Sequence, residues 1–191
     1  NMRLKNSLSR TVFLMLLSCT TYAGDVPTTQ QITNKIIKVA SQYSKVTTCD
    51  ASNIRPSDIA ALSKWDSGRE PEDAEYLVFW NGDMGCTGGT ASYGINFASV
   101  KISRNHDFYV DALESSPNVV ILGSSLLSYL KVIGASKNEV TIQASCGISS
   151  NMVNVPAICD EADSFNLTLR KELIKSNTWM PFGKVARALG L

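Results

Sequence analysis

From residue 74 onward the sequence is a succession of short β-forming runs separated by polar turns, and this pattern constrains the fold more than any other feature. The clearest run is Glu75–Trp80, which is rich in apolar and aromatic residues and ends at the turn pair Asn81-Gly82. Leu126–Ile133 fits either a strand or one face of a helix. The other predicted strands are Ile95–Ile102, Asp107–Leu113, Val119–Leu122, Val140–Cys146 and a last strand across Phe165, Leu167 and Leu169.

Helical patterns precede this β-rich region. The first helix is predicted to open within Thr28–Ile32 and to end near Lys45, a length of about four turns. A second, short helix is predicted after Arg55, because Pro56 would occupy a first helical position and Asp58 the first turn. The apolar face of the first helix consists of Ile32, Ile36, Val39, Ala40 and Tyr43.

Together these elements predict an α+β fold. Residues 24–176 would form a single disulfide-braced domain, with the N-terminal helices packed on an antiparallel sheet of about six short strands. Residues 177–191 are predicted to form a C-terminal tail that either packs as a short helix or frays.

Residues 1–23 have the pattern of a secretory signal peptide. A basic start is followed by the apolar run Val12–Leu17 and by the small-residue exit Thr21-Tyr22-Ala23. The apolar run is far shorter than the roughly 20 residues that a membrane-spanning helix needs. Cleavage after the exit would release a periplasmic or secreted protein, and we favour this route. Leu16–Cys19 also resembles a lipobox, so lipidation of Cys19 would instead give an outer-membrane lipoprotein.

The cysteine content supports export to an oxidising compartment. One of the five cysteines, Cys19, lies in the predicted signal peptide, and the even number that remains predicts two disulfides. Four cysteines can pair in several ways, and sequence alone does not choose among them. We favour pairing Cys49 with Cys86 and Cys146 with Cys159, because each bridge would tie the end of a segment to a nearby loop.

Charge and residue types exclude several function classes. Lysine and arginine number 18 against 17 for aspartate and glutamate, and this near-neutral balance argues against a nucleic-acid partner. We expect membrane contact only if Cys19 is lipidated, and no transmembrane helix in the mature chain. With a single histidine and with its cysteines committed to bridges, the chain is expected to hold neither a metal nor a cofactor.

The densest unusual segment is residues 80–90, which contains four glycines between Gly82 and Gly89. Such a backbone can take positive φ angles and approach a ligand closely. Asp83 could then act as an acid or as a metal ligand. Met84 and Thr87, which lie beside it in the sequence, are further candidate binding residues. The interpretation we favour is structural, namely a turn leading into a disulfide-pinned loop.

Two further residues are singled out by their type. His106 is the only histidine and is predicted to lie in a solvated turn between two strands. Trp179 lies in the predicted tail and is the best candidate for an exposed binding anchor, since tryptophan is enriched in binding hot spots.

The segment Trp80–Gly89 follows the pattern Trp-x-Gly-Asp-x-Gly-Cys-x-Gly-Gly, and Ser115-Ser116-Pro117 follows downstream. In these features the chain resembles small, uncharacterised exported proteobacterial proteins. The resemblance covers about a quarter of the chain and implies bacterial export, but no particular activity.

No catalytic set is predicted, so the leading hypothesis is a binding protein without enzymatic activity. It would act in the periplasm or at the cell surface as an inhibitor, an immunity-type protein or an envelope-assembly component, with a protein or envelope polymer as its partner. One alternative is a small secreted hydrolase acting on cell-wall or glycan material, with Asp83 and His106 as acid and base. Another is a structural lipoprotein held by Cys19.

Overall fold

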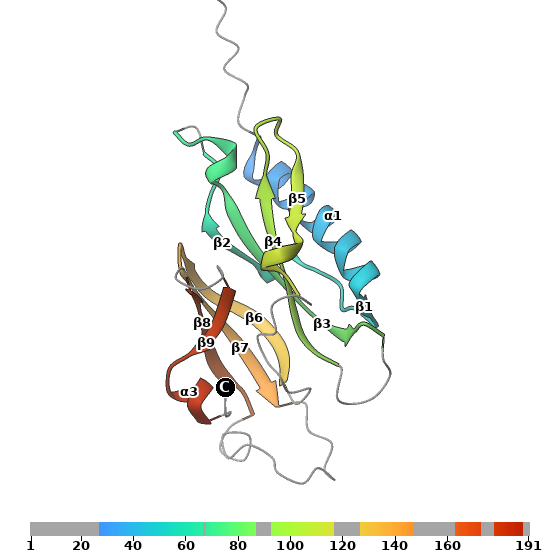
Figure 1. The fold of residues 1–191 in the computed structure, drawn as a ribbon, viewed down its shortest axis with the longest axis vertical. Coiled ribbons are helices and arrows are strands. Elements are labelled where there is room, and N and C mark those ends of the chain that lie inside the picture. Colours follow the sequence, from blue (N-terminus) through green and yellow to red (C-terminus); the bar gives the residue numbers. More distant parts are fainter. Residues whose placement is uncertain are drawn as a thin grey trace, which may run out of the picture.

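A computed structural model of the chain describes residues 27–66, 68–86, 93–116, 127–146, 163–172 and 178–188. Within these ranges the protein has three layers, a helix, a five-stranded sheet and a four-stranded sheet (Figure 1). The predicted signal peptide, including Cys19, lies outside the described residues. No helix within them is long and apolar enough to cross a membrane.

Sheet A contains strands β1 to β5 in the order β1-β3-β4-β5, and β2 also pairs with β3. Sheet B has the order β6-β7-β8-β9, and every strand pair in both sheets is antiparallel. The strands are β1 (Thr48–Cys49), β2 (Ile59–Ser63), β3 (Glu75–Met84), β4 (Tyr93–Ile102), β5 (Phe108–Asp111), β6 (Leu127–Ser136), β7 (Glu139–Cys146), β8 (Phe165–Glu172) and β9 (Thr178–Phe182). The helical elements are α1 (Thr29–Thr47), α3 (Lys184–Ala188) and the single 3-10 turns η1 (Pro56–Asp58), η2 (Pro71–Asp73) and η3 (Ala112–Glu114).

Helix α1 confirms the predicted first helix. Thr28 caps it through a capping box, in which its hydroxyl accepts from the Gln31 backbone and the Gln31 side chain accepts from the Thr28 backbone. The buried face of α1 packs on one face of sheet A. This contact buries Ile32, Ile36 and Ala40 of the helix against Tyr76, Val78, Val100 and Ile102 of the sheet.

Strand β3 is covered on both faces. Its even-numbered residues Tyr76 and Val78 face α1, whereas Leu77 and Phe79 face sheet B. A strand buried on both sides has no polar face, which explains the unbroken apolar run that predicted it. Trp80 ends this run fully buried, with its indole nitrogen donating to the Thr48 hydroxyl at 3.2 Å.

The larger apolar cluster lies between the two sheets. From sheet A it contains Ala60, Leu62, Leu77, Phe79 and Phe97, and from sheet B Leu127, Tyr129, Val140, Ile142, Ala144, Phe165, Leu167, Leu169 and Trp179. Full burial of one such large side chain stabilises the fold by about 1.5–3 kcal/mol. The association of the two sheets therefore accounts for a large part of the apolar core.

Two side chains of the first half of the chain also hold sheet B by hydrogen bonds. The Asn81 amide donates to the Tyr129 carbonyl at 2.8 Å and accepts from the Tyr129 backbone nitrogen at 2.7 Å, as a neighbouring strand would. The Tyr129 hydroxyl donates to the buried carboxylate of Asp58 at 2.9 Å, and Arg55 also bonds to this carboxylate. Burial and the Asp58 charge raise the pKa of Tyr129, so the phenol remains a donor.

The fold is richer in β structure than the α+β arrangement predicted, with two antiparallel sheets and one long helix. The second helix predicted after Arg55 is wrong. Pro56–Asp58 makes only the single 3-10 turn η1, and the following residues become β2, because pairing with β3 satisfies their backbone. Residues 127–136 form a strand rather than a helix, which resolves the ambiguous segment.

Other boundaries also differ from prediction. Asn81 and Gly82 are not a turn, because β3 continues to Met84 opposite β1 and β4. Thr178–Phe182, which the sequence placed in a tail, adds the strand β9 to sheet B and is followed by α3. The predicted strand at 119–122 lies outside the described residues.

Gly82 is required by the close approach of β1. A Cβ atom there would lie 2.3 Å from Cγ2 of the buried Thr48 and 3.1 Å from the Cys49 carbonyl oxygen. We expect Gly82→Ala to lower the free energy of unfolding by about 1–3 kcal/mol, the usual cost of overpacking. Gly134→Ala is the matched control, since no atom lies within 4 Å of its Cβ position. Equal urea-unfolding midpoints for the two variants would contradict this account.

Candidate functional site

The residues predicted at the glycine-rich segment lie at the far end of β3. Asp83 is largely buried and pairs with Cys49 of β1 and Tyr93 of β4, and Met84 is half-buried beside it. Gly85 and Cys86 both have positive φ, at 69° and 56°. These features match the structural interpretation of a turn pinned by a disulfide. Thr87 lies outside the described residues.

One predicted disulfide is confirmed. Cys49 and Cys86 are bonded, with their Cα atoms 5.1 Å apart, so the bridge joins β1 to the end of β3. Cys146 is also disulfide-bonded. Its predicted partner, Cys159, lies outside the described residues.

Trp179 is not the exposed anchor that the sequence indicated. It is fully buried in the cluster between the sheets, because β9 pairs with β8 and places it opposite Lys171. Its indole nitrogen has no hydrogen-bond partner among the residues that the structure describes, and the Lys171 ammonium lies 5.9 Å from the ring centroid. This residue therefore serves the core and is inaccessible to a partner.

Asp83 and His106 lie at opposite ends of the β3–β4 hairpin. Asp83 pairs with Tyr93 at the start of β4, whereas His106 follows the end of β4 at Ile102. Nine residue steps along β4 correspond to roughly 30 Å at the usual strand rise. His106 lies in a turn, as predicted, with φ of 65° and its ring centroid 4.9 Å from that of Trp65. These two side chains cannot act on one bond as acid and base.

The structure instead presents a polar cleft that the sequence analysis missed. The cleft has a volume of about 630 Å³. Its floor is formed by Glu75 and Lys101 of sheet A, and it lies between the β2–β3 connection and the β6–β7 turn of sheet B. Its volume lies within the range of small-molecule sites. The charged side chains that line it are Arg69, Lys101, Lys137, Glu72, Asp73 and Glu75.

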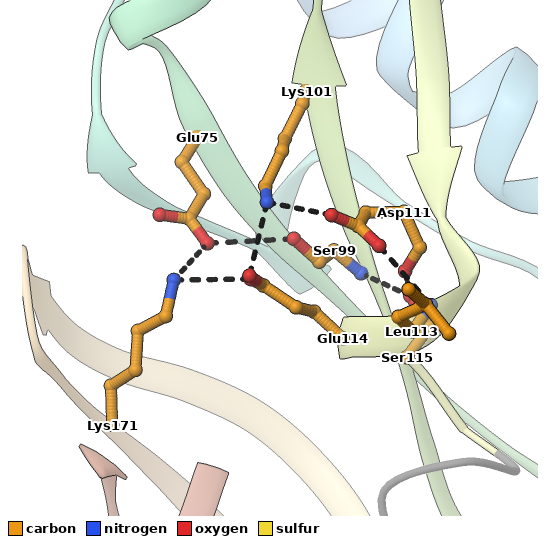
Figure 2. A network of polar contacts seen from close by, with 8 residues as sticks. All are labelled: Glu75, Ser99, Lys101, Asp111, Leu113, Glu114, Ser115 and Lys171. Carbon is orange, nitrogen blue, oxygen red and sulfur yellow. Dashed lines mark hydrogen bonds and ion pairs between the residues drawn. The ribbon is translucent and has the colours of Figure 1, made fainter. Parts of the chain in front are cut away.

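Glu75 and Lys101, the residues of sheet A at the floor of the cleft, belong to a network of ion pairs (Figure 2). The Lys171 ammonium of β8 contacts Glu75 at 2.9 Å and Glu114 at 3.0 Å, which ties sheet B to sheet A and η3. Lys101 of β4 contacts Asp111 at 2.7 Å and Glu114 at 3.1 Å. Glu114 thus accepts from both ammonium groups and joins the two halves of the network.

Strand register explains why these side chains meet. Glu75 pairs with Lys101 across β3 and β4, and Ser99 pairs with Asp111 across β4 and β5. These residues lie on the face of sheet A that carries Leu77, so the apolar core between the sheets ends in charge at this edge.

Hydrogen bonds hold η3 in place beside the network. The Ser115 hydroxyl donates to the Asp111 carbonyl at 2.6 Å and accepts from the Ser99 backbone nitrogen at 2.8 Å. The Asp111 carboxylate accepts from the Leu113 backbone nitrogen at 3.1 Å and so caps η3. The position of Glu114 is therefore fixed by its backbone as well as by its ion pairs.

The proton affinities of two network members are shifted by this environment. Burial by itself would lower the pKa of Lys101, but the hydrogen bonds and charges of Asp111 and Glu114 outweigh it and raise the pKa. Burial would raise the pKa of Asp111, yet Lys101 and the nearby backbone N–H groups bring it below its usual value. Both shifts favour the charged forms.

A sequence signal for this site does exist. Along β3 the residues Glu75, Leu77 and Phe79 alternate on one face, and along β8 Leu167, Leu169 and Lys171 do the same. In both strands the inward face ends in a charged residue. A charged side chain on the buried face of a strand requires a partner of opposite charge. Only the packing of the two sheets shows which residue that partner is.

Comparison with protein-family models, with curated proteins and with solved structures finds no significant match to this chain. The described residues hold no group of three or more histidine, cysteine, aspartate or glutamate side chains arranged to bind a metal ion.

We expect Lys171→Met to destabilise the protein strongly. Its side chain is only 8% exposed, and removing the ammonium would leave the Glu75 carboxylate without its ion pair and Glu114 with Lys101 alone. Breaking a buried ion pair in this way typically costs about 3–5 kcal/mol. The matched control is Arg104→Met, whose ion pair with Glu72 is exposed to solvent and should contribute far less to stability. Urea denaturation measures both, and a Lys171→Met loss no larger than the control would refute the assignment.

The lowered pKa of Asp111 predicts an acid-dependent contribution to stability. The folded pKa lies below the usual value of 3.8, so the stabilisation is present above that pH and disappears as the pH falls through the folded pKa. We expect Asp111→Asn to be less stable than the parent by about 1 kcal/mol at neutral pH. The difference should begin to shrink as the pH falls below 3.8, and it should vanish once the pH is below the lowered folded pKa. A difference that stays unchanged down to the lowest pH at which both proteins fold would show that the effect is not ionic.

Proposed function

We propose that this protein is an exported binding protein of the bacterial periplasm or cell surface, without enzymatic activity, that holds a protein or envelope polymer through the cleft between its sheets. The observation that carries this proposal is the cleft itself. It is lined by six charged side chains, and its floor is fixed by the network around Lys171. Charged groups gathered in a concave surface can bind a charged partner through ion pairs and hydrogen bonds.

The attachment of the two sheets beneath the cleft supports binding. The sheets are joined by a shared apolar core, by the Asn81–Tyr129 hydrogen bonds and by the Lys171 ion pairs, and the connections that line the cleft start from these sheets. A preformed site loses little conformational freedom when a partner binds, so less of the interaction energy is spent on ordering.

The proposed location rests on the predicted signal peptide and on the cysteines. The Cys49–Cys86 disulfide fits an oxidising compartment such as the periplasm, since cytosolic proteins seldom keep such bridges. The hydrolase alternative has lost its proposed acid and base, because Asp83 and His106 lie at opposite ends of one hairpin. Nothing else in the part of the chain that the structure describes favours a catalytic role.

The test is capture of envelope components by immobilised, oxidised protein. We expect one envelope component to bind the parent protein and to be lost from a cleft variant carrying Arg69→Gln, Asp73→Asn and Lys137→Gln. The control variant carries the same changes of charge on exposed residues outside the cleft, and these are Lys131→Gln, Asp163→Asn and Arg187→Gln.

The control variant should retain the component at the parent level. If the cleft variant captures it equally well, the cleft is not the binding site and the proposal fails. Turnover of cell-wall material by the pure protein, abolished in the cleft variant, would also overturn it in favour of an enzyme.

A further inference from the structure

The charges of the cleft divide into those with a partner and those without. Glu75 is paired with Lys171 and Lys101 with Asp111 and Glu114, and Glu72 is paired with Arg104 at 2.8 Å. The remaining charged lining residues are Arg69, Asp73 and Lys137, and none of these three forms an ion pair within the described residues. A ligand in the cleft therefore meets two uncommitted cations and one uncommitted carboxylate.

The floor residues Glu75 and Lys101 belong to a network whose charges do not balance. Besides these two, the network contains the Lys171 ammonium and the carboxylates of Asp111 and Glu114, which do not line the cleft. With all five groups ionised, one negative charge is left over. A cationic group of a ligand is thus favoured toward the floor and Asp73, whereas an anionic group is favoured toward Arg69 and Lys137.

Arg69 is arranged to receive a carboxylate. One of its terminal nitrogens donates to the Ser63 hydroxyl, which holds the guanidinium against the end of β2. The guanidinium has further donors in a planar fork, and this geometry matches the two oxygens of a carboxylate. Lys137, at the exposed β6–β7 turn, adds a second positive charge from the opposite sheet.

We propose that the cleft binds a short peptide with a free carboxylate and a free ammonium group. The carboxylate lies between Arg69 and Lys137, and the ammonium lies at Asp73 above the network floor. This inference rests on the proposed function, since it names the chemistry that the binding protein recognises. Because the charges of the cleft balance overall, it favours a ligand with one positive and one negative group over a ligand whose charges all have the same sign.

The proposal is tested by titrating the full oxidised protein with four trialanine peptides in a calorimeter at low salt. The first has both ends free, the second is acetylated at its amino end, the third is amidated at its carboxyl end, and the fourth is blocked at both. We expect each single block to weaken binding about tenfold, as loss of one charge-assisted hydrogen-bonded pair should. Equal affinities for all four peptides, or no measurable binding of any, would overturn the proposal.

Single variants then assign each end of the peptide. Asp73→Asn should abolish the preference for the free over the acetylated peptide, and it should keep the preference for the free over the amidated one. Arg69→Gln should do the reverse. The control Lys131→Gln lies outside the cleft and should keep both preferences. If either cleft variant removes both preferences together, or neither, the proposed orientation of the ligand is wrong.

A further experiment distinguishes two sources of such a peptide, namely a peptide attached to an envelope polymer and a soluble peptide. Envelope polymer that carries its peptides is compared, by co-sedimentation, with the same polymer after enzymatic removal of the peptides. Binding lost on removal identifies polymer-borne peptide, whereas binding only to the free trialanine identifies a soluble one.

The outcomes also separate this inference from the proposed function. Cleft-dependent capture without discrimination among the peptides refutes the ligand class alone. Discrimination among the peptides without cleft-dependent capture supports the site and refutes the proposed partner binding.

Discussion

The structure depends on the burial of β3 on both faces. Its run from Tyr76 to Trp80 has no polar residue, so neither face can be left in water. One face is covered by α1, and the other is covered by the whole of sheet B, which comes from the second half of the chain. The three layers of Figure 1 are the result of this single constraint, because a lone antiparallel sheet with helices on one side would have left Leu77 and Phe79 exposed.

The same strand explains where the polar cleft forms. The face of β3 that meets sheet B begins with Glu75, and the matching stripe of β8 ends with Lys171. Where the apolar stripes end, the two sheets still lie close enough for these side chains to meet at 2.9 Å. The β2–β3 connection and the β6–β7 turn then rise on either side and supply the remaining charges. The site is thus the polar border of the core rather than a separate insertion.

Sequence patterns predicted the elements whose signals are local. A capping sequence predicted α1, an unbroken apolar run predicted β3, and alternation of apolar and polar residues predicted β7. All three elements are present. The short helix after Arg55 was predicted wrongly because Pro56 and Asp58 fit a 3-10 turn as well as an α-helix, and pairing with β3 decides the rest. Trp179 was misplaced for a related reason, since only pairing with β8 carries it into the core. Contacts between segments about 100 residues apart, such as Glu75 with Lys171, leave no pattern in either segment alone.

The retention of charge at the floor of the cleft is itself an argument for binding. Taking Lys171 and Glu114 out of water is costly, and buried ion pairs can often be replaced by apolar residues without loss of stability. An apolar residue in place of Lys171 would have continued the core that contains Leu77 and Leu169. The network instead joins the sheets by ion pairs and leaves one net negative charge beside the cleft. A partner that enters therefore competes with no existing ion pair, and it meets Arg69, Asp73 and Lys137 at the rim, where the structure has given them no other partner among the described residues.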